Sequence, residues 1–395
     1  MSGARHRPAW AAVDLGAVRH NAAVLARLAA PARLCAVVKA DAYGHGAPAV
    51  ARAALDGGAE WLAVALVDEG VELRQAGIRA PVLLLSEPPA GAMADVVVHD
   101  LVPTVYTESG IDALAGAVEA AAPGRPVAVH LKVDTGMHRA GADPVDVPAL
   151  VGKIAASPSL VLAGLWTHLA VADGPGDEDR AFTAAQLAAL AAVRAALPAG
   201  GAGLVVHAAN SAAAVAHREA RLDLVRCGIA LYGELPAPHL AGVLERSGAC
   251  LRPVLSLRAR VAHVRELDAG SRPSYGRHRA LVERSVVATV PLGYADGVPR
   301  RLFETGGEVL VRGVRRPLAG MVTMDQVVVD CGPPGPPGGA PPVAVGDEVV
   351  FLGTQGTERI GATEWADRLG TISYEVLCAI GPRVPRVPLD GDPPG

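Results

Sequence analysis

Residues 34–46 read LCAVVKADAYGHG, and this stretch decides the class of fold. Its first residues, 34–38, are apolar throughout and lack the alternation expected of a strand with one face in water. The run ends at Lys39, and Tyr43, Gly44 and Gly46 follow closely. A strand covered on both faces that leads into a polar, glycine-containing loop indicates a parallel sheet whose strand ends carry the chemistry.

The same pattern recurs as far as about residue 232. Short apolar runs predict strands at 34–38, 61–66, 82–85, 96–99, 127–133, 161–166 and 204–207. Amphipathic stretches predict helices, most clearly at 47–55, 68–75, 111–122 and 179–197. Seven or eight β/α units over about 200 residues favour a (β/α)8 barrel. The first strand is not followed by the Gly-x-Gly-x-x-Gly fingerprint of a dinucleotide-binding sheet.

The pattern changes after about residue 250, where strands separated by turn residues dominate. These strands are expected at 254–264, 285–291, 308–311, 321–330 and 348–352, and a helix only at 363–369. Residues 332–342, GPPGPPGGAPP, predict a solvent loop because proline and glycine support neither ladder nor helix.

We therefore predict an α/β protein of two domains. An N-terminal (β/α)8 TIM-like barrel spans 12–248, a mainly β C-terminal domain spans 249–388, and residues 389–395 form a flexible tail. Residues 1–11, which precede the barrel, could associate with the second domain.

Composition excludes several classes of protein. The 395 residues carry 36 Lys plus Arg and 40 Asp plus Glu, a net charge of −4, which is too balanced for a dedicated nucleic-acid binder. Five widely spaced cysteines without a Cys-x-x-Cys pair argue against a disulfide framework and indicate a reducing compartment. Without a signal-peptide core or an apolar run of membrane-helix length, the sequence predicts a soluble cytoplasmic protein.

Lysine is rare in this chain, and its few positions are informative. The only lysines are Lys39, Lys132 and Lys153, and the first two follow or end predicted strands. Side chains beyond the C-terminal ends of barrel strands converge on the face that carries the active site. An amine at this apolar rim is partly desolvated, so its pKa falls and it can form a Schiff base. The competing interpretation is a lysine whose charged end simply reaches solvent.

Other polar residues at the predicted strand ends are Asp41, Tyr43, Asp134, Arg139, His168, Asn210, Ser211 and Arg226. Asn210 and Ser211 form a good helix N-cap, and Arg226 precedes a turn opened by Gly228, so both segments offer donors for a phosphate. A lysine, a phosphate cradle and an arginine on one face point to pyridoxal 5'-phosphate. His168 lacks a second histidine or cysteine at metal spacing, so we expect no metal.

The predicted second domain contributes Tyr275 in PSYGRHR, Tyr294 in PLGYADGVPR and Tyr374 in TISYEV. Tyrosine hydroxyls act as general acids or bases when nearby cations lower their pKa, although a half-buried ring without chemistry is an equally good interpretation. The chain contains no Gly-x-x-x-x-Gly-Lys-Ser/Thr loop, no His-Glu-x-x-His and no Gly-x-Ser-x-Gly elbow.

Ten motifs together resemble the alanine racemase family, in order and at similar separations. They are AVVKADAYGHG, LKVDTGM-x-RAG, THLA-x-AD, HAANSAA, VRCGI-x-LYG, SYG, GYADG, MDQ, TISYE and PRVPRV. Any one of them is weak, but the ten in order, covering the chain from residue 14 to about 387, are highly specific.

The resemblance implies a pyridoxal-phosphate-dependent isomerase that interconverts L- and D-alanine for bacterial peptidoglycan and works as a head-to-tail homodimer with shared active sites. Lys39 would hold the cofactor and act as one base, and Tyr275 of the other subunit would be the second. The residues implied in holding the cofactor are Tyr43, Arg139, His168, Asn210, Ser211, Arg226, Gly228, Ile229 and Tyr374. The residues implied in meeting the substrate are Arg139, Met324, Tyr294 and Asp325. Lys132 matches a lysine that is often carbamylated and positions Arg139.

Two departures concern the substrate route. Met321 stands where the family commonly has a basic residue, and Thr323 stands where a cysteine is frequent. They leave open a racemase for serine or a broader set of amino acids. A non-catalytic pyridoxal-phosphate carrier would lack the domain with Tyr275, and a barrel-type decarboxylase would carry a cysteine-acid motif that we do not find.

Overall fold

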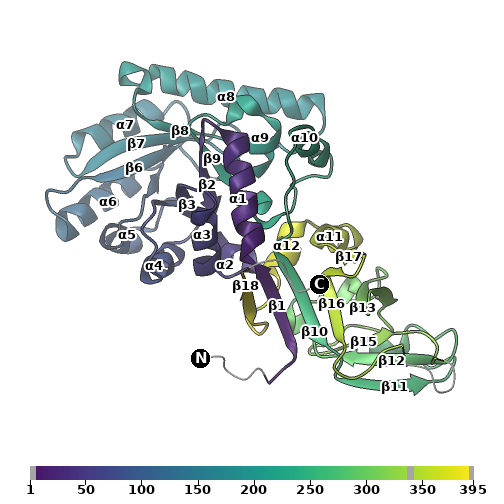
Figure 1. Cartoon of the computed structure of the whole chain (residues 1–395). Helices are drawn as coiled ribbons and strands as arrows, with labels where there is room; N and C mark the ends of the chain where they lie inside the picture. The colour runs from purple at the N-terminus through teal and green to yellow at the C-terminus, as the bar shows by residue number, and fades with distance from the viewer. Residues whose placement is uncertain (1–5, 336–341, 391–395) are drawn as a thin grey trace. The chain divides into compact units, whose positions relative to one another are not determined.

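The computed structural model describes residues 6–335 and 342–390, in two compact units (Figure 1). The barrel unit comprises residues 17–42 and 46–252, and the β unit comprises the described residues within 1–16, 43–45 and 253–395. The predicted domain boundaries, 12–248 and 249–388, stay predictions. No helix in the described ranges is both long and apolar enough to cross a membrane.

The barrel unit is built on two four-stranded parallel sheets, in the orders β4-β3-β2-β9 and β5-β6-β7-β8. The strands are β2 (Arg33–Val37), β3 (Trp61–Val64), β4 (Val82–Leu84), β5 (Thr104–Val105), β6 (Val127–Lys132), β7 (Leu160–Trp166), β8 (Val205–His207) and β9 (Leu224–Cys227). A parallel bridge between Leu83 and Val102 joins the sheets at one seam. At the other seam the amide of Asp223 donates to Val206 O at 3.0 Å. The sheets therefore close into a (β/α)8 barrel.

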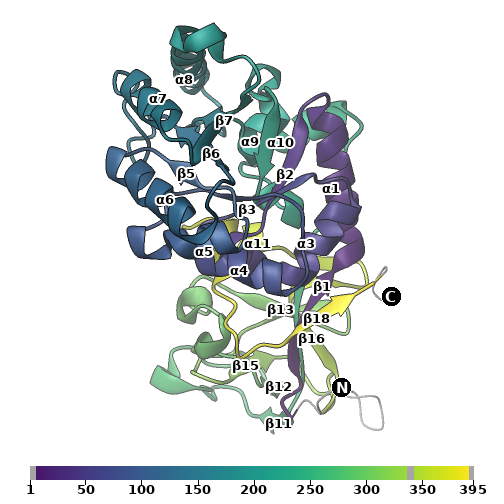
Figure 2. The same ribbon diagram turned by 90° about the vertical axis from the view of Figure 1, so that its left-hand side faces the viewer.

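Helices surround these strands on the outside (Figure 2). They are α1 (Leu15–Ala29), α3 (Ala47–Asp56), α4 (Val67–Gln75), α5 (Met93–Val98), α6 (Glu108–Ala121), α7 (Val147–Ala156), α8 (Asp177–Ala196), α9 (Ser211–Ala216) and α10 (Leu240–Arg246). Each of the longer helices buries one apolar stripe, as α6 does with Ile111, Leu114 and Val118. The strands are buried on both faces, which explains their apolar runs.

One predicted strand of the barrel is wrong. Residues 96–99 belong to α5 and the turn after it, and the barrel strand at this place is β5 instead. Met93, Val96 and Val97 are buried while Val98 is exposed, so the valines follow a helical period rather than the alternation of a strand. β5 has only two residues and follows Pro103, and a proline argues against a strand when the sequence is considered alone.

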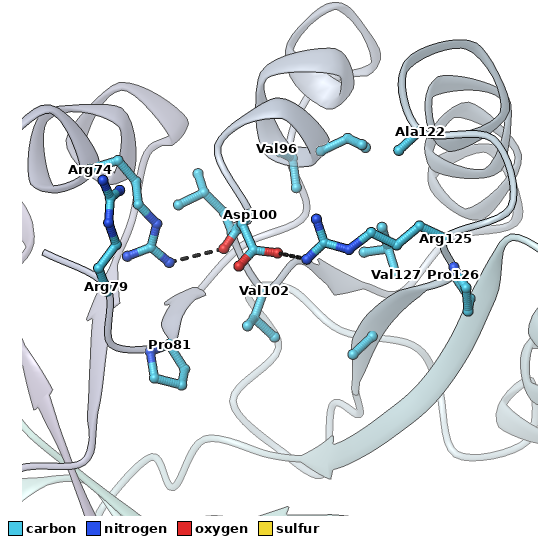
Figure 3. Close-up of a pocket in the computed structure, with 13 residues that line it drawn as sticks. Arg74, Arg79, Pro81, Val96, Asp100, Val102, Ala122, Arg125, Pro126 and Val127 are labelled. Carbon is cyan, nitrogen blue, oxygen red and sulfur yellow. Dashed lines mark hydrogen bonds and ion pairs between the residues drawn. The ribbon is translucent and has the colours of Figure 1, made fainter. Parts of the chain in front are cut away.

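The N-terminal ends of β4, β5 and β6 border a cavity of about 260 Å³ (Figure 3). Arg74 of α4 is nearly buried there, and its guanidinium donates to the carbonyl oxygens of His99, Ile78, Ala80 and Asp100 at 2.9–3.0 Å. The Asp100 carboxylate accepts from Arg125 Nη2 at 2.8 Å. The cations at this end of the barrel are therefore held by oxygens of the chain itself.

The β unit contains a seven-stranded sheet in the order β14-β13-β16-β10-β1-β18, with β17 paired to β16, and a three-stranded sheet β11-β12-β15. The first sheet comprises β1 (Ala9–Asp14), β10 (Leu255–Arg260), β13 (Glu308–Val311), β14 (Val314–Pro317), β16 (Glu348–Gln355), β17 (Glu358–Ile360) and β18 (Arg386–Leu389). The second comprises β11 (His263–Leu267), β12 (Ser285–Val290) and β15 (Val327–Asp330). The predicted fold class, a barrel followed by a mainly β domain, is confirmed.

Two predictions within the β unit are wrong. The strand expected at 321–330 begins only at Val327, because the Thr323 hydroxyl and amide both bond to Gln326 O and hold the preceding residues in a turn. A second helix, α12 (Ser373–Cys378), follows α11 (Ala362–Leu369), although only 363–369 is expected to be helical. The β-branched residues Thr371 and Ile372 just before it favour a strand locally, whereas the observed turn buries Val376 and Leu377.

Two expected flexible segments lie largely outside the described residues. In the predicted loop 332–342, residues 336–341 are not described, and in the predicted tail 389–395 the same holds for residues 391–395. Leu389 is the last residue of β18, which pairs in parallel with β1.

Candidate active site

The C-terminal ends of the barrel strands bring five predicted site residues together. Lys39 follows β2, Lys132 ends β6, His168 follows β7 and Arg226 lies in β9. The charges of Lys39, Arg139 and Arg226 each lower the pKa of Lys132, and the same three charges with Lys132 lower that of His168. Mutual electrostatic influence of this kind requires proximity. The structure thus gathers the cations that the sequence placed at separate strand ends.

The segment after Lys39 has an uncommon backbone. α2 (Lys39–Gly44) is left-handed, with φ of 53° at Ala40, 52° at Asp41, 53° at Ala42 and 54° at Tyr43. Each non-glycine residue in this conformation costs about 1–2 kcal/mol. The cost is offset locally, because Glu69 Oε1 accepts from the Ala40 amide at 2.5 Å and Asp41 Oδ1 accepts from the Ala47 amide at 2.7 Å. Strain held in this way is typical of a functional segment.

Arg226 is the buried cation at the centre of the site. Its Nη2 donates to the carbonyl oxygens of Thr167 at 2.9 Å and Ala208 at 3.0 Å, and lies 3.3 Å from His168 Nδ1. Its Nη1 donates to His207 Nδ1 at 2.8 Å. Burial lowers the pKa of Arg226 to about 10, so the guanidinium stays protonated at neutral pH.

Two histidines behind Arg226 have defined protonation. Because Arg226 donates to Nδ1 of His207, the ring proton of that histidine lies on Nε2, which donates to His130 Nδ1 at 2.9 Å. Burial, and next the charge of Arg226, lower the pKa of His207 and bring that of His130 to about 4. Both imidazoles are therefore neutral. His130 Nε2 is buried without a partner in the described structure.

Trp166 supports the two cations nearest to these histidines. The indole stacks on His207 with ring centroids 5.3 Å apart, the Arg226 guanidinium lies 4.5 Å from its centroid and Lys132 Nζ lies 4.7 Å from it. Cation–π contacts stabilise charge without neutralising it. The sequence prediction used Trp166 and His207 only as strand ends and missed His130. The sequence feature that could have indicated them is an aromatic or imidazole side chain in the C-terminal half of each of β6, β7 and β8.

Lys132 is a buried lysine with a lowered pKa. It is 4% exposed, and burial, followed by the charges of Arg139 and Arg226, lowers its pKa to about 8. Asp134, the carboxylate that opposes this shift, is held by the amides of Gly136 at 2.9 Å and His138 at 3.0 Å. A substantial fraction of Lys132 is therefore a neutral amine at mildly alkaline pH.

The two predicted phosphate-binding segments meet. Asn210 caps α9 as predicted, since its Oδ1 accepts from the Ala213 amide at 3.0 Å. Ser211 Oγ accepts from the amides of Gly228 at 2.9 Å and Ala230 at 3.4 Å. The cradle thus combines the start of α9 with the turn at residues 228–230 that also contains Ile229.

Four of the predicted tyrosines lie in the β unit. The ring centroids of Tyr43 and Tyr374 are 6.1 Å apart, and the carbonyl of Gly44, the residue after Tyr43, accepts from Arg386 Nε at 2.7 Å. Tyr275 is 75% exposed and Tyr294 is 43% exposed. A tyrosine as exposed as Tyr275 is available to another molecule.

The turn at 321–326 carries the predicted substrate residues of this unit. Met324 is exposed, and Asp325 accepts a hydrogen bond from Arg383 Nη2 at 2.7 Å. Met321, one of the two departures, is buried, and its carbonyl accepts from Ser274 Oγ at 2.6 Å. Thr323 is engaged with Gln326. No group of three or more potential metal ligands occurs within the ranges that the structure covers.

Comparison with known proteins settles the family. Residues 13–236 match the alanine racemase N-terminal domain, and residues 254–388 match the alanine racemase C-terminal domain. A relative from Symbiobacterium thermophilum named alanine racemase is 46% identical over 96% of this chain and 97% of its own. Another from Sorangium cellulosum is 43% identical over 96% and 98%. The chain belongs to the alanine racemase family.

Solved alanine racemases share the fold. The enzyme from D-cycloserine-producing Streptomyces lavendulae is 38% identical with a TM-score of 0.87, covering 98% of both chains. The enzyme from Bacillus anthracis, solved with bound L-Ala-P, is 34% identical with a TM-score of 0.86, covering 98% of this chain and 96% of its own. Membership in the alanine racemase family confirms the predicted resemblance, the fold class and the enzyme class, an isomerase.

Proposed function

We propose that this protein racemises alanine, interconverting the L and D enantiomers, with pyridoxal 5'-phosphate as cofactor. The observation that carries the proposal is the group of four cations, Lys39, Lys132, Arg139 and Arg226, at the C-terminal end of a barrel from the alanine racemase family. A site with this excess of positive charge favours an anionic cofactor and an amino-acid carboxylate.

The hydrogen-bond donors and charges at this end of the barrel suit the ring and the phosphate of pyridoxal phosphate. The protonated Arg226 lies beside neutral His168, and Ser211 Oγ accepts from the backbone amides of Gly228 and Ala230 at the start of a turn. The residues assigned to the cofactor are Lys39, Tyr43, Arg139, His168, Asn210, Ser211, Arg226, Gly228, Ile229 and Tyr374. When bound, such a cofactor acts as an electron sink that makes the α-proton of an amino acid removable.

Arg226 would determine how strong that sink is. A guanidinium with a pKa of about 10 donates a hydrogen bond and does not transfer its proton. Nor can His207 or His168 supply a proton in place of Arg226, because both imidazoles are neutral at neutral pH. Arg226 thus favours the short chemical path of racemisation over side reactions that need a long-lived carbanion.

Racemisation needs a base on each face of the α-carbon, and we assign Lys39 and Tyr275 to these roles. Lys39 Nζ would exchange a proton on one face, and Tyr275 Oη would do so on the other. Two fixed bases avoid any turning of the substrate in the site. We assign Arg139, Met324, Tyr294 and Asp325 to substrate binding and its entrance, with Arg139 meeting the carboxylate.

We propose that Lys132 carries a carbamate. The ammonium first loses one proton; the neutral amine then attacks carbon dioxide, an N–C bond forms as one C=O π bond opens onto oxygen, and the nitrogen releases a second proton, so that an anionic carbamate replaces the cation. A pKa of about 8 supports this step, since the reaction needs the unprotonated amine. The carbamate would reduce the charge excess and position Arg139 for the substrate carboxylate.

We also propose a homodimer with shared sites, in which Tyr275 acts in the partner's site. The high exposure of Tyr275 supports a role outside its own subunit. D-Alanine for peptidoglycan in the bacterial cytoplasm is the physiological role that fits such an enzyme. Mixing Lys39→Ala with Tyr275→Phe subunits should restore part of the activity. No recovery after proven subunit exchange would place each site within one chain.

The test of the proposed function is a racemisation assay on the purified protein with L- and D-amino acids, with the visible absorbance of bound cofactor measured alongside. We expect alanine to give the highest kcat/KM in both directions and serine to be slower. A cofactor-loaded protein that leaves alanine optically active would refute the proposal. A preference for serine would assign the departures at Met321 and Thr323 to substrate choice.

A further inference from the structure

The loop that carries Tyr294 is fixed by a buried carboxylate. Residues 293–297, GYADG, place Asp296 completely out of solvent. Its Oδ2 accepts from the Gly293 amide at 3.0 Å. Its Oδ1 accepts from Arg7 Nη2 at 2.8 Å and lies 3.4 Å from Arg383 Nε. A buried carboxylate requires such partners, so the position of the loop depends on them.

This loop is joined directly to the turn that carries Met324 and Asp325. The Tyr294 amide donates to Thr323 O at 2.9 Å, and the Ala295 amide donates to Met324 O at 3.1 Å. The approach is too close for any side chain at Gly293, where an added Cβ would lie 2.3 Å from Thr323 O. Backbone hydrogen bonds therefore join the two segments that carry the proposed entrance residues of this subunit.

Arg383 connects the two carboxylates of this piece. Its Nη2 donates to Asp325 Oδ1 at 2.7 Å while its Nε faces Asp296. Arg7 also donates to the Arg383 carbonyl at 3.3 Å. Two guanidinium groups thus balance two carboxylates, and Arg7 provides the shorter contact to the buried one. With Arg7 in place, Arg383 is available to pair with Asp325.

We propose that Arg7 is a positioning residue for the substrate entrance, acting through Asp296 and Arg383. Without the Arg7 charge, the buried Asp296 draws Arg383 to itself. Asp325 then loses its partner and presents an unpaired negative charge where the carboxylate of an amino acid must pass. This inference rests on the proposed function, which places Tyr294, Met324 and Asp325 at the entrance.

The first test is the steady-state kinetics of the holoenzyme with Arg7→Gln. We expect KM for L-alanine to rise by about tenfold while kcat per bound cofactor stays within about twofold. Arg7→Lys keeps a charged donor and should restore most of the KM. Arg284→Gln, which breaks a surface ion pair to Glu266 in the same unit, is the matched control and should leave both constants unchanged.

The second test is a double-mutant cycle with Asp325→Asn. If an unpaired Asp325 causes the defect, Asp325→Asn should recover at least about threefold of the KM lost in Arg7→Gln. Arg7→Gln with unchanged KM, with equal losses of kcat and kcat/KM, or with no recovery in the double variant would overturn the proposal.

Hydrogen exchange separates this inference from the proposed function. The amide of Gly293 should exchange faster in Arg7→Gln than in the parent protein, because its acceptor Asp296 then has one guanidinium partner instead of two. A parent protein that fails to racemise any amino acid refutes the proposed function, whereas unchanged exchange in residues 291–299 refutes the role of Arg7.

Discussion

The two ends of the barrel each bury an arginine, and they use it for different purposes. At the N-terminal end, Arg74 donates to four backbone carbonyls, and Asp100 pairs with Arg125 (Figure 3). At the C-terminal end, Arg226 donates to two backbone carbonyls and also contacts two neutral histidines, with further cations nearby. A buried charge surrounded by oxygens of the chain stabilises the fold, whereas one surrounded by like charges favours a bound anion.

The largest expected effect tests the reactive lysine at the C-terminal end. Lys39→Ala should lower racemase activity by at least about 10³-fold and abolish the visible absorbance of bound cofactor, because the base and the covalent attachment are both lost. Lys153→Ala is the matched control, since Lys153 of α7 pairs through Nζ with Asp112 of α6 at 2.8 Å, and the activity of this variant should be normal. Normal turnover in Lys39→Ala would contradict the assignment.

Substitution of the central arginine should affect chemistry before stability. Arg226→Met should lower kcat by about 10²-fold, because a preorganised donor at the cofactor ring is lost. A second readout is the imidazole of His168: burial is the largest cause of its low pKa of about 3, and the Arg226 charge is the next, so the pKa should rise in the variant. Titration by NMR of the apoprotein checks this, and an unmoved His168 would count against the cluster.

The equivalent substitution at the other end should do the opposite. Arg74→Met should lower the free energy of unfolding by about 3 kcal/mol, because four buried carbonyls lose their donor. The kcat of the folded variant should stay normal. Arg125→Gln, which removes an exposed ion pair to Asp100, should cost no more than about 0.5 kcal/mol. A loss of kcat in folded Arg74→Met would break the contrast between the two ends.

The smallest expected effect is the acid sensitivity of the C-terminal end. His130 and His168 have folded pKa values of about 4 and about 3, below the ordinary 6.5, so the unfolded chain binds more protons in this interval. Their contribution to stability is present above pH 6.5 and is lost as the pH falls towards 4. We expect each of these imidazoles to cost the apoprotein about 2 kcal/mol between pH 6.5 and 4.5.

Denaturant unfolding at each pH measures this loss. His130→Gln should reduce the pH slope by up to one proton, because one buried imidazole no longer titrates. His263→Gln, at an exposed histidine of the β unit, should leave the slope unchanged. Equal slopes in all three proteins would show that the buried histidines are not the source.

Much of the barrel was predictable because its signals are local. The apolar runs at β2, β6 and β7 and the N-cap at Asn210 follow from side-chain period and capping chemistry, which act within a few residues. Residues 96–99 failed for the same reason: three valines in a row suit a strand locally, and only burial against the barrel makes them helical.

In the candidate site, too, features with a local sequence signal were predictable and features that depend on distant contacts were not. The rarity of lysine and the ten motifs pointed to Lys39, Lys132 and the family before any coordinates. The left-handed turn at residues 40–43 could not be predicted, because alanine, aspartate and tyrosine avoid that conformation unless distant groups such as Glu69 hold it. Arg7 and Asp296, 289 residues apart, carried no sequence signal of their contact.

The sequence by itself determined the barrel, the β unit, the family and which residues can exchange protons, since these depend on residue type, period and order. Only the tertiary structure decided their charge states. It made His207 and His130 neutral, gave Lys132 a pKa of about 8 and left Arg226 protonated. The physical reason is that desolvation and the field of neighbouring charges depend on which side chains meet in space.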